Sequence, residues 1–206
     1  KTKGINYNPL KQSVIRKICV YCASSRQADS VYSDSAHNLG SLLAKNHITI
    51  VYGGGSVGSM GALANGALSS GGKVIGILPQ FMHDLEWGHK RLTELRIVES
   101  MQERKRLMIE DVDATVALPG GSGTFEELLE TITQKRLGLY LKPIVLVNTC
   151  NYYDPLIAML ESAVQKQFMD QRHLQVWQVV EQAKEVLEAI RKAPAWSSNA
   201  VKFAAP

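Results

Sequence analysis

The chain has 206 residues, of which 45% are hydrophobic and 20% are charged, and its formal net charge at pH 7 is +4. These values are typical of one globular domain with a full core, and the net charge is too small to favour nucleic acid as a partner. No apolar run reaches the roughly 18 residues that a transmembrane helix needs, so we expect neither nucleic acid nor a membrane among the partners.

Segments typical of strands alternate along the chain with segments typical of helices. The expected strands are Lys17–Ala23, Thr49–Tyr52, Lys73–Leu78, Leu95–Val98, Ala114–Leu118, Pro143–Val147 and Val176–Val180. The expected helices are Val31–Lys45, Ser59–Ser70, Met101–Glu110, Thr124–Leu137, Pro155–Gln167 and Glu181–Arg191. Several strands are short, continuous apolar runs, which is typical of strands covered on both faces. The alternation predicts an α/β fold: a Rossmann-like, doubly wound parallel sheet flanked by helices in a single domain.

We expect this domain over residues 17–191, between an N-terminal extension at 1–16 and a C-terminal tail at 192–206. The three cysteines, Cys19, Cys22 and Cys150, do not form a disulfide framework. Cys19 and Cys22 lie three residues apart on an expected strand, so their side chains point to opposite faces and do not form a metal or redox pair. The sequence therefore predicts buried structural cysteines at these two positions and a cytoplasmic, reducing location.

The most informative segment is 119–127, Pro-Gly-Gly-Ser-Gly-Thr-Phe-Glu-Glu, which lies between an expected strand and an expected helix. Glycines allow a ligand to approach the backbone closely, and a helix N-terminus presents N–H groups and about half a positive charge to an anion. Glu126 and Glu127 follow one turn into the helix. A phosphate site does not require carboxylates there, whereas a site that holds sugar hydroxyls or stabilises a cationic sugar does.

Two further loops are expected at the same edge of the sheet, because ligands of doubly wound sheets bind at the carboxyl ends of the strands. They are Ser24-Ser25, after the first strand, and the glycine-rich segment 53–61, after the second. The latter contains Gly53-x-Gly55-x-x-Gly58, which formally matches a dinucleotide fingerprint. It does not follow the first strand, and no acid ends the next one, so NAD is not favoured. Tight strand–helix packing remains an open alternative for this loop, but ligand contact is favoured because two such loops occur.

Charged side chains cluster in two other segments. Arg104 and Lys105 lie in an expected helix that starts at the crevice, where they either clamp an anion or form a solvated basic face. The segment 81–90 reads as a loop, and its acids and histidines are Asp84, Glu86, His83 and His89. Their spacing does not match that of metal ligands, so we expect no metal site there and favour a carboxylate that points at a ligand.

Several of these segments together resemble the Lonely guy family of cytokinin riboside 5′-monophosphate phosphoribohydrolases, whose members are often mislabelled lysine decarboxylases. The resemblance covers roughly residues 17–190. Its motifs are Val51-Tyr52-Gly53-Gly54-Gly55-Ser56-Val57-Gly58, Met101-Gln102-Glu103-Arg104-Lys105, Pro119-Gly120-Gly121-Ser122-Gly123-Thr124 through Glu127, and Tyr152-Tyr153-Asp154-Pro155-Leu156. The resemblance implies a Rossmann-like fold, a homodimer or larger homo-oligomer with its site near the interface, and no cofactor. It implies hydrolysis of the N-glycosidic bond of adenosine 5′-monophosphates, often N6-prenylated, to free base and ribose 5-phosphate.

The resemblance also implies residue roles. Arg104 and Glu127 match the residues that the family needs for activity, and Gly121 to Thr124 match its phosphate-binding loop. The expected substrate-binding residues are Ser24, Gly54, Gly55, Glu86, Arg104, Lys105, Gly121, Ser122, Gly123, Thr124, Phe125, Glu126, Glu127 and Thr133. The family usually has His at the position of Gln102 and Tyr at that of Ser122, so the preferred base substituent is left open.

The chemistry of the residues agrees with this activity. Cleavage of a ribosyl N-glycosidic bond builds positive charge on the sugar, which a carboxylate such as Glu127 would stabilise while it positions water. Arg104 would anchor the nucleotide or assist departure of the base. Three alternatives remain: a general AMP nucleosidase without cytokinin preference, a non-catalytic purine-nucleotide-binding module, and a pyridoxal-phosphate decarboxylase. The last needs a Schiff-base lysine with an acid partner for the cofactor, a setting that the neighbours of Lys105 do not provide.

Overall fold

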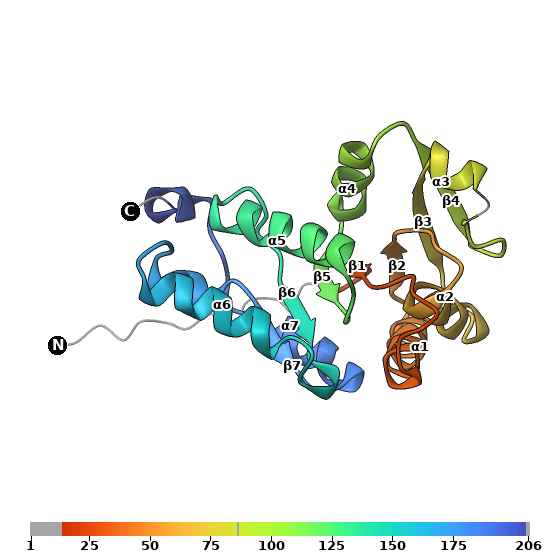
Figure 1. Ribbon diagram of the computed structural model, residues 1–206, viewed down its shortest axis with the longest axis horizontal. Helices are drawn as coiled ribbons and strands as arrows, with labels where there is room; N and C mark the ends of the chain where they lie inside the picture. The colour runs from red at the N-terminus through yellow and green to blue at the C-terminus, as the bar shows by residue number, and fades with distance from the viewer. Residues whose placement is uncertain (1–13, 86, 205–206) are drawn as a thin grey trace.

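The computed structural model describes residues 14–85 and 87–204, which form a layered α/β structure around one parallel sheet (Figure 1). The sheet has seven strands in the order β4-β3-β2-β1-β5-β6-β7. The strands are β1 Lys17–Tyr21, β2 Thr49–Tyr52, β3 Val74–Pro79, β4 Glu94–Val98, β5 Ala114–Ala117, β6 Ile144–Val147 and β7 Gln178–Val180. Every neighbouring pair is parallel. The predicted doubly wound α/β fold is therefore confirmed.

The helices follow the strands as the alternation predicts. They are α1 Ser30–Lys45, α2 Gly58–Ser69, α3 Gln80–Asp84, α4 Met101–Ile109, α5 Ser122–Arg136, α6 Asp154–Gln165 and α7 Val186–Lys192. Four short 3₁₀ segments complete the described chain: η1 Thr149–Asn151, η2 Gln171–Gln175, η3 Ala183–Glu185 and η4 Ser198–Phe203. Among the described residues, no helix is long and apolar enough to cross a membrane.

The structure corrects the expectation that residues 81–90 form only a loop. A short helix, α3, begins at Gln80, directly after Pro79 ends β3. The fixed φ of proline suits a residue that precedes a helix, and the Gln80 side chain donates to Asp84 Oδ1 one turn later at 2.7 Å. The predicted helix at 181–191 likewise begins as the 3₁₀ segment η3 before α7 continues it.

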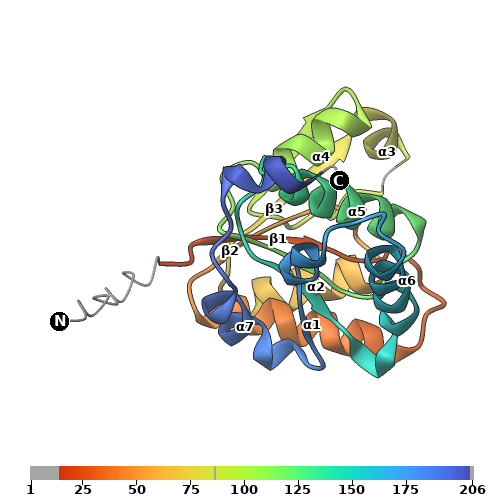
Figure 2. The same ribbon diagram turned by 90° about the vertical axis from the view of Figure 1, so that its left-hand side faces the viewer.

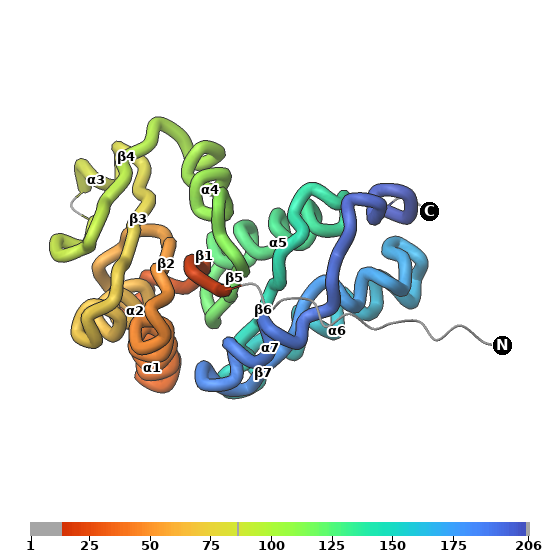
Figure 3. The backbone as a smooth tube through the Cα atoms, turned by 180° about the vertical axis from the view of Figure 1, so that it is seen from behind, coloured from red at the N-terminus to blue at the C-terminus, as the bar shows by residue number. Residues whose placement is uncertain are grey.

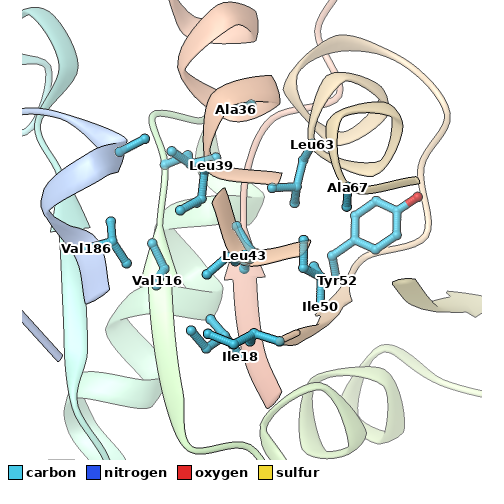
Figure 4. Close-up of a cluster of buried hydrophobic side chains, with 14 of the residues drawn as sticks. Ile18, Ala36, Leu39, Leu43, Ile50, Tyr52, Leu63, Ala67, Val116 and Val186 are labelled. Carbon is cyan, nitrogen blue, oxygen red and sulfur yellow. The ribbon is translucent and has the colours of Figure 1, made fainter. Parts of the chain in front are cut away.

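Apolar side chains from helices pack on both faces of the sheet. In Figure 2, α1, α2 and α7 lie below the sheet and α4 and α5 lie above it. Figure 4 shows the core on the first face, where Leu39 and Leu43 of α1 meet Leu63 of α2. Cys22 belongs to this core and Cys19 to the core on the opposite face, and neither forms a disulfide. The prediction of buried cysteines on opposite faces is confirmed.

The functional edge of the sheet follows from its strand order. β1 pairs with both β2 and β5, so the order of connections reverses between β1 and β5. Chains that leave neighbouring parallel strands on opposite sides open a crevice between them, and ligands of such sheets bind there. The loops after β1, β2 and β5 consequently meet at one end of the sheet, as the backbone trace in Figure 3 allows the reader to follow.

The segment after α7 packs against α5 on the upper side of the sheet. Trp196 Nε1 donates to the carbonyl of Lys135 at 2.7 Å, and Arg136 donates to the carbonyl of Ala204 at 3.2 Å. The ring of Phe203 lies edge to face with Trp196. Residues 192–204 therefore belong to the same layered structure as the sheet. The expected N-terminal extension falls almost wholly on residues 1–13, outside the described part of the chain.

Candidate active site at the carboxyl edge of the sheet

A cavity of about 640 Å³ opens at the carboxyl ends of β1, β2 and β5. Eight of the predicted site residues line it: Ser24, Gly55, Arg104, Gly121, Ser122, Gly123, Thr124 and Glu127. They come from three loops and from the helices α4 and α5, which are separated along the chain and brought together by the crossover at β1. The structure therefore assembles in one place the segments that the sequence analysis expected to converge.

The proline–glycine loop and the start of α5 form one wall of this cavity. Gly121 precedes α5 as its N-cap and offers no side-chain acceptor, so the first N–H groups of the helix are left for a ligand. A Cβ atom on Gly121 or Gly123 would meet no protein atom within 4 Å, whereas one on Gly120 would lie 2.1 Å from Thr124 Oγ1. Packing therefore requires glycine at 120, while the two glycines beyond it keep the approach to the backbone open.

Two tyrosines hold this loop from behind. The hydroxyl of Tyr152 donates to the carbonyl of Gly120 at 2.5 Å, and that of Tyr153 donates to the carbonyl of Leu118 at 2.7 Å. The ring of Tyr152 also stacks on Phe125, with 6.2 Å between the ring centroids. These contacts engage carbonyls of the loop, and neither tyrosine lines the cavity, so the N–H groups of the loop are left for a ligand. The Tyr-Tyr motif is thus a support for the loop.

A buried ion pair between α4 and α5 forms the floor of the cavity. Arg104 Nη1 donates to Glu127 Oε1 at 2.7 Å, and their side chains are only 5% and 4% exposed. Arg104 also donates through Nε to the carbonyl of Ile77 at 3.1 Å and through Nη2 to the carbonyl of Gly53 at 3.4 Å. Three backbone and side-chain acceptors hold the guanidinium in one orientation, and that orientation fixes the carboxylate.

Burial shifts the pKa of the carboxyl group in this pair. Desolvation raises the pKa of Glu127 above its ordinary value of 4.5, and the nearby positive charge of Arg104 opposes that rise. Burial also raises the pKa of the Cys22 thiol, which lines the same cavity and lies close enough to feel the charge of Glu127. The thiol is therefore protonated near neutral pH, and the ion pair carries the reactive charges of the site.

The glycine loop after β2 serves both purposes that the sequence left open. A Cβ on Gly53 would lie 2.1 Å from Arg104 Nη2, so the guanidinium occupies the space that a side chain would need. Gly58 has a φ of +60°, and a Cβ there would lie 2.4 Å from the carbonyl oxygen of Ser25. Gly53 and Gly55 line the cavity, while Gly58 brings α2 against the loop after β1.

Several predicted site residues lie outside the cavity lining. These are Gly54, Lys105, Phe125, Glu126 and Thr133. Lys105 donates to Glu126 at 2.5 Å and lies 2.6 Å from Glu130, so it joins α4 to α5 on the outer side of the buried pair. Gly54 packs against β3, where a Cβ on it would lie 3.3 Å from the Cβ of Leu78. Glu86 lies outside the described residues.

Six apolar side chains also line the cavity, and sequence reasoning missed this apolar part of the lining. Its side chains are Val57, Met60, Leu78, Met82, Trp87 and Met101. Three of these six residues, Met60, Met82 and Met101, are in the first turns of helices that follow the strands, a position that faces the crevice and was available as a signal. Arg26 also lines the cavity and was missed, although it directly follows the predicted Ser24-Ser25 turn.

No lysine lines this cavity among the residues that the structure describes. The buried lysine with the lowered pKa, about 8 because of desolvation, is Lys135. It donates to the carbonyl of Lys142 and lies at the far end of α5, roughly 20 Å along the helix from Ser122. Over residues 14–85 and 87–204, no three His, Cys, Asp or Glu side chains are grouped to hold a metal ion.

Comparison with known proteins places the chain among curated enzymes. A family model described as "possible lysine decarboxylase" matches residues 60–190. The Arabidopsis thaliana protein named cytokinin riboside 5′-monophosphate phosphoribohydrolase LOG3 is 38% identical over 195 residues, which cover 94% of this chain and 91% of that protein. A Rhodococcoides fascians protein, named cytokinin riboside 5′-monophosphate phosphoribohydrolase, is 43% identical over 155 residues, which cover 75% of this chain and 78% of the relative.

Solved structures share the fold at lower identity. The molybdenum cofactor carrier protein of Chlamydomonas reinhardtii has a TM-score of 0.67 and 20% identity, over 87% of this chain and 98% of its own. The molybdenum cofactor binding protein of Rippkaea orientalis has a TM-score of 0.65 and 23% identity, over 86% of this chain and 96% of its own. At these identities the likeness concerns the fold alone. The family model and the curated relatives, by contrast, confirm the resemblance read from the motifs: the chain belongs to the Lonely guy family.

Proposed function

We propose that this chain hydrolyses the N-glycosidic bond of N6-modified adenosine 5′-monophosphates and releases the free base and ribose 5-phosphate. The observation that carries the proposal is the buried pair of Arg104 and Glu127, placed on the floor of a cavity whose wall is the start of α5. The printed names of the relatives support the same reaction.

The 5′-phosphate of the substrate would bind at the start of α5. Open glycines, uncapped N–H groups and the helix dipole make that end of the cavity suited to an anion. Glu127 lies one turn further along the same helix, so the ribose of a nucleotide anchored there would extend over its carboxylate. Binding of the phosphate, which is remote from the bond that breaks, would orient the sugar for reaction.

In the proposed reaction the bond between C1′ and the base nitrogen breaks, and water oxygen bonds to C1′. Positive charge develops on the ribosyl ring, as in other glycoside hydrolyses, and the carboxylate of Glu127 stabilises it. Glu127 accepts a hydrogen bond from the attacking water, whose proton finally resides on the departing base. Arg104 holds the carboxylate ionised and oriented, which is a preorganised electrostatic contribution to the rate.

The apolar part of the cavity lining supports a preference for an N6 substituent. With the phosphate at α5 and the ribose at Glu127, the base would extend toward side chains such as Met82, Trp87 and Met101. Burial of each methylene group there contributes about 0.8 kcal/mol. An isoprenoid group would therefore bind better than the bare amino group of adenine.

A panel of substrates tests this function. We expect kcat/KM for N6-isopentenyl-AMP to exceed that for AMP by about tenfold or more, because a hydrophobic pocket gains 1–3 kcal/mol even from a small apolar group. We expect the free nucleoside, N6-isopentenyladenosine, to react at least about 100-fold less efficiently, because it lacks the phosphate binding energy. Release of the base and of ribose 5-phosphate would be followed by liquid chromatography.

The same panel separates the competing functions. Equal values for AMP and N6-isopentenyl-AMP would identify a general AMP nucleosidase. Binding of AMP in calorimetry without any release of base would identify a nucleotide-binding module and overturn the proposed hydrolysis. A decarboxylase would release carbon dioxide from lysine when pyridoxal phosphate is added.

We also propose that the chain forms a homodimer, or a larger homo-oligomer, with its site near the interface. Apolar side chains are exposed on α5 and in the turn after it, namely Leu129, Leu137, Leu139 and Leu141. A second copy would cover this surface, since exposed apolar clusters of this kind mark interfaces. Light scattering on the purified protein should give at least twice the 22.7 kDa mass of the chain. A monomer at micromolar concentration would contradict the proposal.

Residues 17–191 would form the catalytic domain of this enzyme. The described cysteines are all free, which suits a cytoplasmic, reducing location.

A further inference from the structure

We propose that Arg26 is the cationic partner of the substrate's 5′-phosphate and the residue that makes the reaction select phosphorylated nucleosides. The inference rests on the proposed function and deepens it. Neither the family motifs nor the sequence analysis singled out this residue. Its side chain lines the cavity from the loop after β1, at the point where the connections of the sheet reverse.

The charges of the cavity leave a phosphate without a full counter-charge unless Arg26 supplies it. The charged side chains that line the cavity, among the described residues, are Arg26, Arg104 and Glu127. Arg104 is paired with Glu127, and its other donors hold backbone carbonyls, so this pair is neutral as a unit. A phosphate monoester carries about −1.5 to −2 charges at pH 7. The start of α5 offers N–H groups and only about half a charge.

Arg26 is available for that role. It is exposed, and within residues 14–85 and 87–204 no carboxylate lies in ion-pair distance of it. A guanidinium can donate two parallel hydrogen bonds to phosphate oxygens, which is a geometry that neither Lys nor a neutral side chain reproduces. The positive charge would also attract nucleotides over nucleosides before binding.

The loop beneath Arg26 is held in place, so its side chain emerges from a fixed point. The N–H of Met60, in the first turn of α2, donates to the carbonyl of Ala23 at 2.9 Å. Gly58 packs so closely on Ser25 that no larger residue fits between them. The chain is therefore clamped against α2 up to the residue before Arg26. A fixed stem reduces the conformational entropy that ordering the arginine on a phosphate would otherwise cost.

The experiment compares Arg26→Gln and Arg26→Lys with a control, Arg91→Gln. Arg91 is exposed and lines a different cavity, where it donates to Asn65, so the control removes the same charge elsewhere. We expect Arg26→Gln to raise KM for N6-isopentenyl-AMP by about 10- to 100-fold with kcat within a few fold, because the charge-assisted hydrogen bonds to the phosphate are lost. The kcat/KM for N6-isopentenyladenosine should not change. The KM of Arg26→Lys for the nucleotide should lie between those of the parent protein and Arg26→Gln. The KM of Arg91→Gln should match that of the parent protein.

Calorimetry with ribose 5-phosphate gives a readout that does not depend on turnover. Arg26→Gln should weaken its binding by a factor similar to the rise in KM. The assignment would be overturned if Arg26→Gln lost kcat/KM equally for the nucleotide and the nucleoside, or if its affinity for ribose 5-phosphate were unchanged. If the parent protein cleaves no substrate but Arg26→Gln still weakens binding of ribose 5-phosphate, then the proposed hydrolysis fails while the assignment of Arg26 stands.

Discussion

Replacement of Glu127 by Gln should lower kcat for N6-isopentenyl-AMP by about 10²- to 10⁴-fold, the usual range for removal of a group that transfers or stabilises charge at the reacting centre. The variant should remain folded, because the amide has nearly the same shape and its oxygen can still accept the hydrogen bond from Arg104 Nη1. KM should change little, since the carboxylate acts mainly on the charged transition state. Steady-state rates and circular dichroism would be measured on the same samples.

Glu130→Gln is the matched control for this substitution. Glu130 lies one turn further along α5, is 40% exposed and pairs with Lys105 outside the cavity. We expect its kcat to stay within about twofold of the parent value, because an exposed ion pair contributes at most about 1 kcal/mol to stability and nothing to the reacting centre. A Glu127→Gln enzyme with near-parental turnover would remove the proposed role of the carboxylate.

The pH dependence of the parent enzyme offers an independent check on Glu127. The reaction needs the ionised carboxylate, and burial raises the pKa of Glu127 above 4.5. In the free enzyme, kcat/KM should therefore fall as pH decreases, with an apparent pKa above that ordinary value.

Replacement of Arg104 by Met should destabilise the protein by about 3–5 kcal/mol at pH 8, because it leaves the carboxylate of Glu127 buried without its partner. The side chain of Glu127 is only 4% exposed, so loss of the guanidinium removes the main counter-charge of a carboxylate that has little contact with bulk solvent. Urea denaturation would give the free energy of unfolding. The same variant should lose activity, since both the charge and the orientation of the carboxylate depend on Arg104.

A double variant and a control variant test whether the loss of stability in Arg104→Met comes from the unpaired carboxylate of Glu127. The double variant Arg104→Met/Glu127→Leu should regain most of the lost stability and remain inactive, because apolar residues often replace a buried ion pair at little cost. Arg106→Met removes an exposed arginine from the same helix, which pairs with Glu110, and should cost no more than about 1 kcal/mol. A double variant as unstable as Arg104→Met would show that the destabilisation has another cause.

The loss of stability in Arg104→Met should be smaller at low pH than at high pH. Without the guanidinium, the charge and the hydrogen bond that oppose desolvation most strongly are gone, so the pKa of Glu127 in the folded state rises further above the unfolded value. A raised pKa means that the folded state binds the proton more tightly, and this contribution is present at low pH and lost as pH rises through the folded pKa. The variant should therefore be closer in stability to the parent at pH 5 than at pH 8.

The order of strands and helices could be read from the sequence because each element carries its own local signal. Apolar runs such as Ala114–Leu118, bounded by Pro119 and glycines, predict a buried strand in any context. The predicted bounds of the helices were wrong where local backbone geometry overrides the apolar pattern of the sequence. The helix α3 begins directly after Pro79 and extends into a segment read as a loop, and the 3₁₀ segment η3 precedes α7 in the helix predicted over 181–191.

The sequence identified Arg104 and Glu127 as functional residues in two separate motifs. It did not predict that the two side chains contact each other. The residues are 23 positions apart, and their 2.7 Å hydrogen bond exists because α4 and α5 pack beside one another on the same face of the sheet. Lys105, one residue from Arg104, points to the outer side and meets Glu126 and Glu130 instead. A helix turns about 100° per residue, so neighbours in one motif serve different surfaces.

By itself, the sequence determined the alternation of strands and helices, the glycine loop with its trailing acids, and the family to which the chain belongs, since these are recorded in local composition and spacing. Only the tertiary structure decided which charges are buried together, which of the motif residues face the cavity, and that an apolar part of the lining and Arg26 complete it. Those features depend on the crossover between β1 and β5, which joins segments remote in the chain. Because burial and charge pairing arise from such contacts, they are properties of the packed layers and of no single segment.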